Sequence, residues 1–100
     1  MGFPDMSDDE MFRAIADPTR RLILDELSAR SEQTLYDLTA RLLTNRGVGM
    51  SRQAIGKHLR VLRDAGLVQI ERRGKFKVLR LDDAPLRRLH ERWIPRWVSA

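Results

Sequence analysis

Apolar residues recur every three or four positions along several stretches of the chain, a spacing that places them on one face of a helix. The clearest stretch spans residues 51–69. Its apolar stripe consists of Ala54, Ile55, Leu59, Leu62 and Ala65. Ser51 is expected to cap this helix, because its hydroxyl can accept a hydrogen bond from an unpaired backbone N–H. Gly66 is expected to end it, since glycine enters the left-handed conformation at little cost.

Two helices are predicted near the N-terminus, after a loose leader of residues 1–6. Ser7 and the acids that follow it fit a capping box for a helix that reaches about Ile15. Asp17 can cap a second helix, with Pro18 at its first position. The inward positions of this second helix are Leu22, Ile23 and Leu27.

Arg20 and Arg21 lie near the start of the second helix, where positive charge opposes the helix dipole. A phosphate or a carboxylate close to them would explain this placement. The alternative is that both arginines are exposed and have no role.

A third helix is predicted to open at Thr34. Its inward residues are Leu35, Leu38 and Leu42, with Leu43 as a further candidate. A glycine-bearing loop over residues 44–50 then leads directly into the helix at Ser51. Two helices joined in this way, the second of them basic on its outer face, are typical of a helix-turn-helix.

After Gly66 the apolar period changes from helical spacing to every second residue, which predicts a β-hairpin. The alternating positions are Val68, Ile70, Phe76 and Val78, on either side of a basic tip at residues 72–75. Leu79 and Leu81 fall on the other face of the second strand, so the alternation leaves open which face is buried. In a helix-turn-helix protein, a β-hairpin that follows the second helix of the motif is called a wing.

A last helix is predicted to begin at residues 82–85, which read Asp-Asp-Ala-Pro. Its apolar positions are Leu86, Leu89, Trp93 and Trp97. Pro95 lies inside this segment and is expected to kink the helix or end its regular hydrogen bonding. The predicted fold is therefore mainly α with a small β-hairpin (α+β): one winged helix-turn-helix domain over residues 1–100.

Positive charge is concentrated in one segment of the chain. Residues 46–80 hold ten Lys or Arg and two acids, whereas the remainder holds nine basic residues and twelve acids. This imbalance indicates a polyanion as partner, because contacts of Lys and Arg with phosphates dominate affinity for nucleic acids. The basic segment lacks the bulky aromatic anchors of a membrane-surface helix, so double-stranded DNA is the expected partner.

The helix after Ser51 is predicted to be the DNA recognition helix. Its outer face has almost no acid, whereas a solvated face normally carries both signs of charge. Gln53 can pair with a base edge, and Gly56 allows close approach of the backbone. The wing is expected to supply affinity more than sequence choice. The predicted DNA-binding residues are Arg52, Gln53, Gly56, Lys57, His58, Arg60, Arg63, Arg72, Arg73 and Lys75.

The chain resembles the bacterial ArsR-type winged helix-turn-helix repressors. The motifs that carry the resemblance are FRAIADPTRRLILDEL at residues 12–27, SRQAIGKHLRVLRDAGLV at 51–68 and RRGKFKVLRLD at 72–82. The resemblance implies a homodimer that is paired through the first and last helices, binds an imperfect palindrome and represses transcription. The predicted dimer-interface residues are Met11, Phe12, Ile15, Leu86, Leu89, Trp93 and Trp97.

No catalytic site, metal site or cofactor is predicted. The chain has no cysteine, so the thiolate ligands of metal-sensing family members are missing. His90 stands beside Glu91, and adjacent residues point in different directions on a helix. His58 has no serine, carboxylate or second histidine placed to partner it in catalysis. Trp93 and Trp97 are expected in the core or the dimer contact more than in an effector pocket, and the sequence leaves open whether an effector exists.

The alternative function is a winged-helix adaptor that binds another protein through its Trp-bearing helix, with basic residues kept for solubility. No apolar run approaches membrane-spanning length, and the N-terminus lacks the form of a signal peptide. A cytoplasmic protein without membrane contact is therefore expected.

Overall fold

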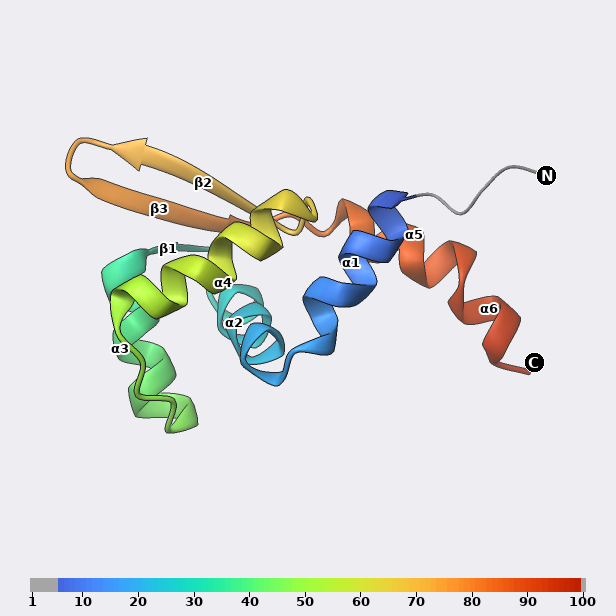
Figure 1. Cartoon of the computed structure of the whole chain (residues 1–100), viewed down its shortest axis with the longest axis horizontal. Helices are drawn as coiled ribbons and strands as arrows, with labels where there is room; N and C mark the ends of the chain where they lie inside the picture. The colour runs from blue at the N-terminus through green and yellow to red at the C-terminus, as the bar shows by residue number, and fades with distance from the viewer. Residues whose placement is uncertain (1–5, 100) are drawn as a thin grey trace.

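The computed structural model describes residues 6–99, which form helices packed beside a small antiparallel sheet (Figure 1). The hairpin tip and the C-terminal helices lie at opposite ends of the long axis. The elements in chain order are α1 (Met6–Ala16), α2 (Pro18–Ala29), β1 (Glu32–Thr34), α3 (Leu35–Arg46), α4 (Arg52–Asp64), β2 (Val68–Arg73), β3 (Phe76–Leu81), α5 (Ala84–Arg92) and α6 (Ile94–Trp97). This arrangement confirms the predicted fold class.

The predicted caps Asp17 and Ser51 are confirmed by their hydrogen bonds, and Thr34, where the third helix was predicted to open, caps α3 in the same way. The side chains of Asp17, Thr34 and Ser51 each accept a bond of 3.0–3.1 Å from the backbone N–H three residues later. Gly66 ends α4 with φ of 81°, and the N–H of Leu67 reaches the carbonyl of Leu62 at 2.9 Å, as in a Schellman motif. α1 begins at Met6, one residue before the predicted cap, and the rest of the leader lies outside the described residues.

Arg20 and Arg21 both donate hydrogen bonds to the C-terminal end of α1. Arg20 donates to the carbonyls of Ala14 at 2.7 Å and Arg13 at 3.1 Å, and Arg21 donates to those of Ile15 and Ala16 at 2.8 and 2.9 Å. The last carbonyls of a helix have no partner within the helix, and one residue alone separates α1 from α2. The two arginines therefore cap one helix from the start of the next.

The hydrophobic core lies between α2, α3, α4 and the base of the hairpin. Its larger buried members are Met11, Ile23, Leu27, Leu38, Leu42, Ile55, Leu59, Leu62, Leu67 and Leu79. Leu43 points outward with 59% of its surface exposed, so its inward placement was wrong. Leu42 already occupies the buried position of that turn of α3.

One buried carboxylate joins α2 to α3. Glu26 is 1% exposed and accepts hydrogen bonds from Arg41 at 3.1 Å, Arg46 at 2.9 Å and Asn45 at 3.3 Å. Burial by itself would raise the pKa of the Glu26 carboxyl. The bonds from Arg46, Asn45 and Arg41 together outweigh burial and hold this pKa below its usual value.

The sheet has three antiparallel strands in the order β1-β3-β2. β1 was not predicted, because three residues are too few to show alternation. Val68, Ile70, Leu79 and Leu81 share the face that packs against the core, and Val78 on the opposite face is also buried. Burial at the base of the hairpin is therefore two-sided, which is why alternation alone did not identify one buried face.

The C-terminal helices are attached to α1 by a second buried carboxylate. Asp8 is 2% exposed and accepts bonds from Arg88 at 3.2 Å and from the indole N–H of Trp93 at 3.1 Å. α5 ends at Arg92 and a short α6 follows, which confirms that Pro95 interrupts the predicted helix.

Candidate nucleic-acid interface

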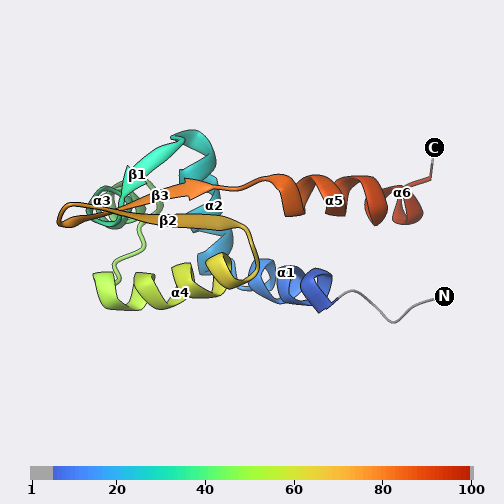
Figure 2. The same ribbon diagram turned by 90° about the horizontal axis from the view of Figure 1, so that it is seen from above.

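α4 presents its polar face to solvent and its apolar face to the core, as the spacing of its residues predicts. Ile55, Leu59 and Leu62 are buried. The exposed residues of the polar face are Arg52, Gln53, Lys57, Arg60 and Arg63. Figure 2 shows α4 running alongside the hairpin, with its N-terminal end toward the hairpin tip. The residues nearest that end are therefore presented together with the wing.

The turn between α3 and α4 is shorter than predicted. α3 continues to Arg46 and is ended by Gly47, whose φ is 67°. The connecting segment therefore covers residues 47–51, not 44–50. Val48 and Met50 in this segment pack against the core, which fixes the position of α4 relative to α3.

Gly56 lies in the middle of the polar face with nothing crowding it. The nearest atom to a Cβ built at this position is a guanidinium nitrogen of Arg60, 4.0 Å away. A shallow groove of about 650 Å³ passes over Gly56. The residues that line it are Leu35, Arg52, Gln53, Gly56, Lys57, Arg60 and Lys77. It thus brings together five of the predicted DNA-binding residues with one residue of the wing.

His58 lies on the inner side of the recognition helix, whereas most of the other residues predicted to bind DNA lie on its exposed side. Its Nδ1 is 3.3 Å from a guanidinium nitrogen of Arg20, and the side chain is half-buried. Since Arg20 also binds the end of α1, this contact links the recognition helix to the α1–α2 junction. DNA contact by His58 stays a prediction.

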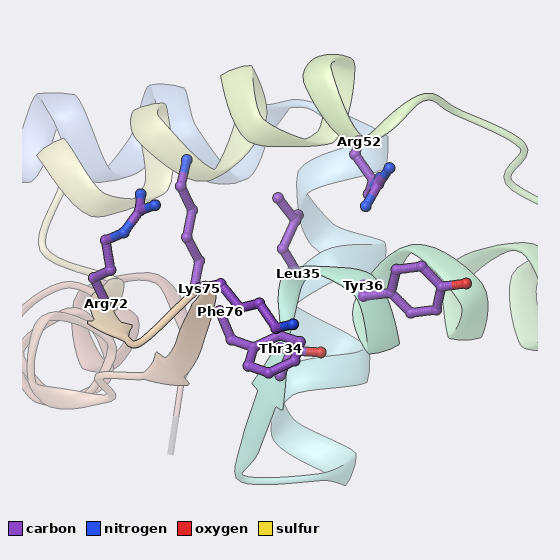
Figure 3. Close-up of a pocket in the computed structure, with 8 residues that line it drawn as sticks. Thr34, Leu35, Tyr36, Arg52, Arg72, Lys75 and Phe76 are labelled. Carbon is purple, nitrogen blue, oxygen red and sulfur yellow. The ribbon is translucent and has the colours of Figure 1, made fainter.

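The three predicted wing residues have different surroundings. Arg72 and Lys75 are exposed and line a hollow of about 320 Å³ between the hairpin and the start of α3 (Figure 3). Arg73 binds Glu32 at 2.9 Å and Glu71 at 3.0 Å. Hydrogen bonds to Glu71 and then Glu32 raise the pKa of Arg73 above its usual value. Arg73 is therefore engaged within the sheet, whereas Arg72 and Lys75 face open space.

Two residues at this surface were not predicted. Tyr36 is 65% exposed, and the Arg52 guanidinium lies over its ring, 5.5 Å from the centroid, as Figure 3 shows. Lys77 borders both the groove over Gly56 and the hollow beside the wing. The sequence held a signal for Lys77: a hairpin with a two-residue turn at residues 74–75 places Lys77 opposite Arg72. No local pattern in the sequence indicated Tyr36.

The predicted dimer-interface residues fall into three groups. Met11 is fully buried in the protein's own core, so it does not belong to an exposed interface. Ile15, Leu86 and Leu89 pack partly against the core. Phe12, Trp93 and Trp97 form an aromatic cluster with ring centroids 5.7–6.2 Å apart.

Among residues 6–99, none of the helices combines the length and the apolar character that spanning a membrane requires. In the same range, no three side chains of the metal-binding types gather in one place.

The fold and this surface define a winged helix-turn-helix protein with a basic recognition helix. Residues 15–71 match the family described as a helix-turn-helix domain. The chain is 56% identical over 86 residues to the uncharacterized HTH-type transcriptional regulator YuzN of Bacillus subtilis strain 168, covering 86% of this chain and 94% of YuzN. It is 35% identical over 66 residues to the transcriptional repressor SdpR of the same organism, covering 66% of each chain.

A solved structure gives the same result. The ArsR-like transcriptional regulator from Rhodococcus sp. RHA1 superposes with a TM-score of 0.70 at 34% identity, over 86% of this chain and 74% of that chain. The protein belongs to the ArsR-type family of helix-turn-helix transcriptional regulators, a class that binds double-stranded DNA. This membership favours DNA binding over the adaptor alternative.

Proposed function

We propose that this protein is a transcriptional repressor that binds a palindromic operator as a homodimer. The observation that carries the proposal is the exposed, acid-poor face of α4 beside a basic wing. Repression is supported by the 35% identity to the repressor SdpR. A dimer bound to its operator would block access of the transcription machinery, in the cytoplasm where bacterial DNA lies. No cofactor and no catalytic step enter this proposal.

Docking of α4 in the major groove gives the polar residues different roles. N-terminal residues of a recognition helix come closest to base edges, so Arg52, Gln53 and Lys57 would contact bases. Arg60 and Arg63 lie further along and would contact phosphates. Arg63 is paired with Asp64 at 3.2 Å, but both side chains are largely exposed. Such surface pairs are weak, and Arg63 remains available to DNA.

Gln53→Ala is expected to reduce preference for the operator while leaving non-specific binding nearly unchanged. A bidentate pair between glutamine and adenine is worth about 1–3 kcal/mol of discrimination. Arg63→Ala should weaken binding to both kinds of duplex equally. The measurement is the affinity of each variant for a duplex selected by the wild type from a random pool, and for its scrambled version, at matched salt. Arg87→Ala on α5 is the control for loss of one positive charge. An unchanged operator preference in Gln53→Ala would show that this residue does not read the sequence.

Self-association is supported by apolar surface at the C-terminal end. Trp97 is 60% and Val98 61% exposed. Trp97 belongs to the aromatic cluster that connects α1 with α6, and Val98 follows it in the chain. Figures 1 and 2 both show α5 and α6 at the end of the molecule opposite the hairpin tip. A dimer joined there leaves both recognition helices free to face DNA.

Trp97→Ala is expected to weaken dimerisation by at least about tenfold, because burying an aromatic side chain contributes roughly 1.5–3 kcal/mol. Trp97 suits this test better than Trp93, whose indole binds Asp8 within the chain. Sedimentation equilibrium at several protein concentrations gives the dissociation constant. Leu43→Ala is the matched control, since Leu43 is equally exposed but lies on α3. A wild-type protein that is monomeric at micromolar concentration would refute the dimer.

A further inference from the structure

Two basic residues are paired directly across the hairpin. In the register of β2 and β3, Arg72 pairs with Lys77. Residues paired in this way point to the same face of the sheet, and like charges there destabilise the pair. The same face carries Ile70 and Leu79, which together with Lys77 line a hollow against Gly56 and Arg60 of α4. The two cations therefore belong to the side of the wing that faces the recognition helix.

The opposite face of the sheet is arranged differently. There Arg73 binds Glu32 and Glu71, while Arg80 binds the amide oxygen of Gln69 at 2.9 Å. Acidic partners are thus present in the sheet, but they lie on the other face. Within residues 6–99, no ion pair joins Arg72 or Lys77 to a carboxylate.

The space in front of Arg72 and Lys77 is lined by further positive charge. The hollow beside the wing includes Lys75 and Arg52, and no acid lines it. In Figure 3, Arg72 and Lys75 extend from the hairpin on one side, and Arg52 lies across the opening above Tyr36. An anion in this position would relieve the repulsion between the paired cations.

We propose that Arg72 and Lys77 together bind one backbone phosphate of the DNA strand that passes between the recognition helix and the wing. This inference rests on the proposed DNA-binding function. A helix in the major groove and a wing beside it stand on either side of one sugar–phosphate strand. The hollow beside the wing lies between the hairpin, the start of α3 and Arg52, the first residue of the recognition helix. The pair adds Lys77 to the DNA-binding residues and gives the wing base a defined role in positioning the strand.

The test is the salt dependence of binding to a random-sequence duplex. The logarithm of the affinity falls linearly with the logarithm of the salt concentration, and the slope has a magnitude of about 0.9 for each phosphate neutralised. The double variant Arg72→Gln/Lys77→Gln is expected to lower this slope by about 0.9, the value for one shared phosphate. Arg80→Gln/Arg87→Gln removes the same net charge elsewhere and should leave the slope unchanged. A decrease of about 1.8 would mean two separate phosphates, and an unchanged slope would mean no contact; either result overturns the proposal.

A second measurement tests the repulsion without DNA. Arg72→Gln should raise the melting temperature at low salt, and the gain should shrink at high salt because salt screens exposed charges. A lower melting temperature at low salt would contradict the repulsion on which the inference depends.

Failure of the wild type to bind any duplex would refute the proposed function itself. Duplex binding by the wild type together with an unchanged slope in the double variant would refute the shared phosphate site alone.

Discussion

Replacing Arg41 and Arg46 together with methionine is expected to destabilise the protein by about 3–5 kcal/mol at neutral pH, the cost of leaving a buried charge without partners. Both arginines bind the carboxylate of Glu26, which is 1% exposed. Methionine keeps much of the side-chain volume, so the loss is mainly electrostatic. Asn45 remains as a hydrogen-bond donor to the carboxylate, but it carries no charge.

The pH dependence separates this effect from a loss of packing. In the wild type, the lowered pKa of Glu26 contributes stability above the unfolded pKa, and this contribution is lost as pH falls through the folded value. Without the arginines, burial raises the folded pKa above the unfolded one, so the cost grows as pH rises above about 4.3. The difference between variant and wild type should therefore be larger at neutral pH than near pH 4, and smallest once pH lies below the lowered folded pKa of Glu26.

Urea unfolding at both pH values measures the two free energies of unfolding. The control variant Arg30→Met/Arg87→Met removes two positive charges from exposed positions and should change stability little at either pH. Glu26→Gln removes the buried charge itself and should cost less than the double arginine variant. An equal loss at both pH values would show that the arginines stabilise the protein by packing rather than through the Glu26 charge.

Gly56→Leu is expected to abolish operator binding, with a loss of about a hundredfold or more, while the fold becomes no less stable. Glycine inside a helix destabilises by about 0.5–1 kcal/mol relative to alanine, and a Cβ at Gly56 meets no atom closer than 4.0 Å. The major groove is about 12 Å wide and barely admits a helix with its side chains. A leucine in the centre of the docking face would therefore hold α4 away from the bases, where each lost pair costs about 1–3 kcal/mol.

The measurement combines operator affinity with thermal unfolding of the same preparations. Gly56→Ala should raise stability with a smaller loss of affinity, because its side chain is short. Val61→Leu enlarges another exposed side chain of α4 and serves as the control for added apolar volume. Operator binding by Gly56→Leu at wild-type affinity would mean that Gly56 does not face the groove.

The predictions that held were those that depend on neighbouring residues. Asp17, Thr34 and Ser51 cap their helices because a short side chain reaches an N–H three residues away. Gly66 ends α4 for a similarly local reason. The apolar stripe and the basic face of α4 follow from helical periodicity, so the candidate recognition surface was evident before the fold was known.

Contacts between distant segments were decided by the tertiary structure. β1 exists because Glu32–Thr34 pairs with β3, and three residues have no pattern of their own. Arg73 carries the same charge as Arg72 but faces the acids of the sheet. Strand alternation sends neighbouring residues to opposite faces, and the sequence did not indicate what each face would meet.

The sequence by itself determined the class of protein, the order of its main elements and the basic face of α4, because periodicity, capping and turn chemistry act over a few residues. The tertiary structure alone decided that Glu26 and Asp8 are buried, since their arginine partners lie 15 to 20 and 80 or more positions away. It also decided that Met11 belongs to the core and Trp97 to the surface. Met11 lies on α1 and Trp97 on α6, and both helices carry apolar side chains. Which of these side chains are covered depends on how each helix packs against the rest of the protein.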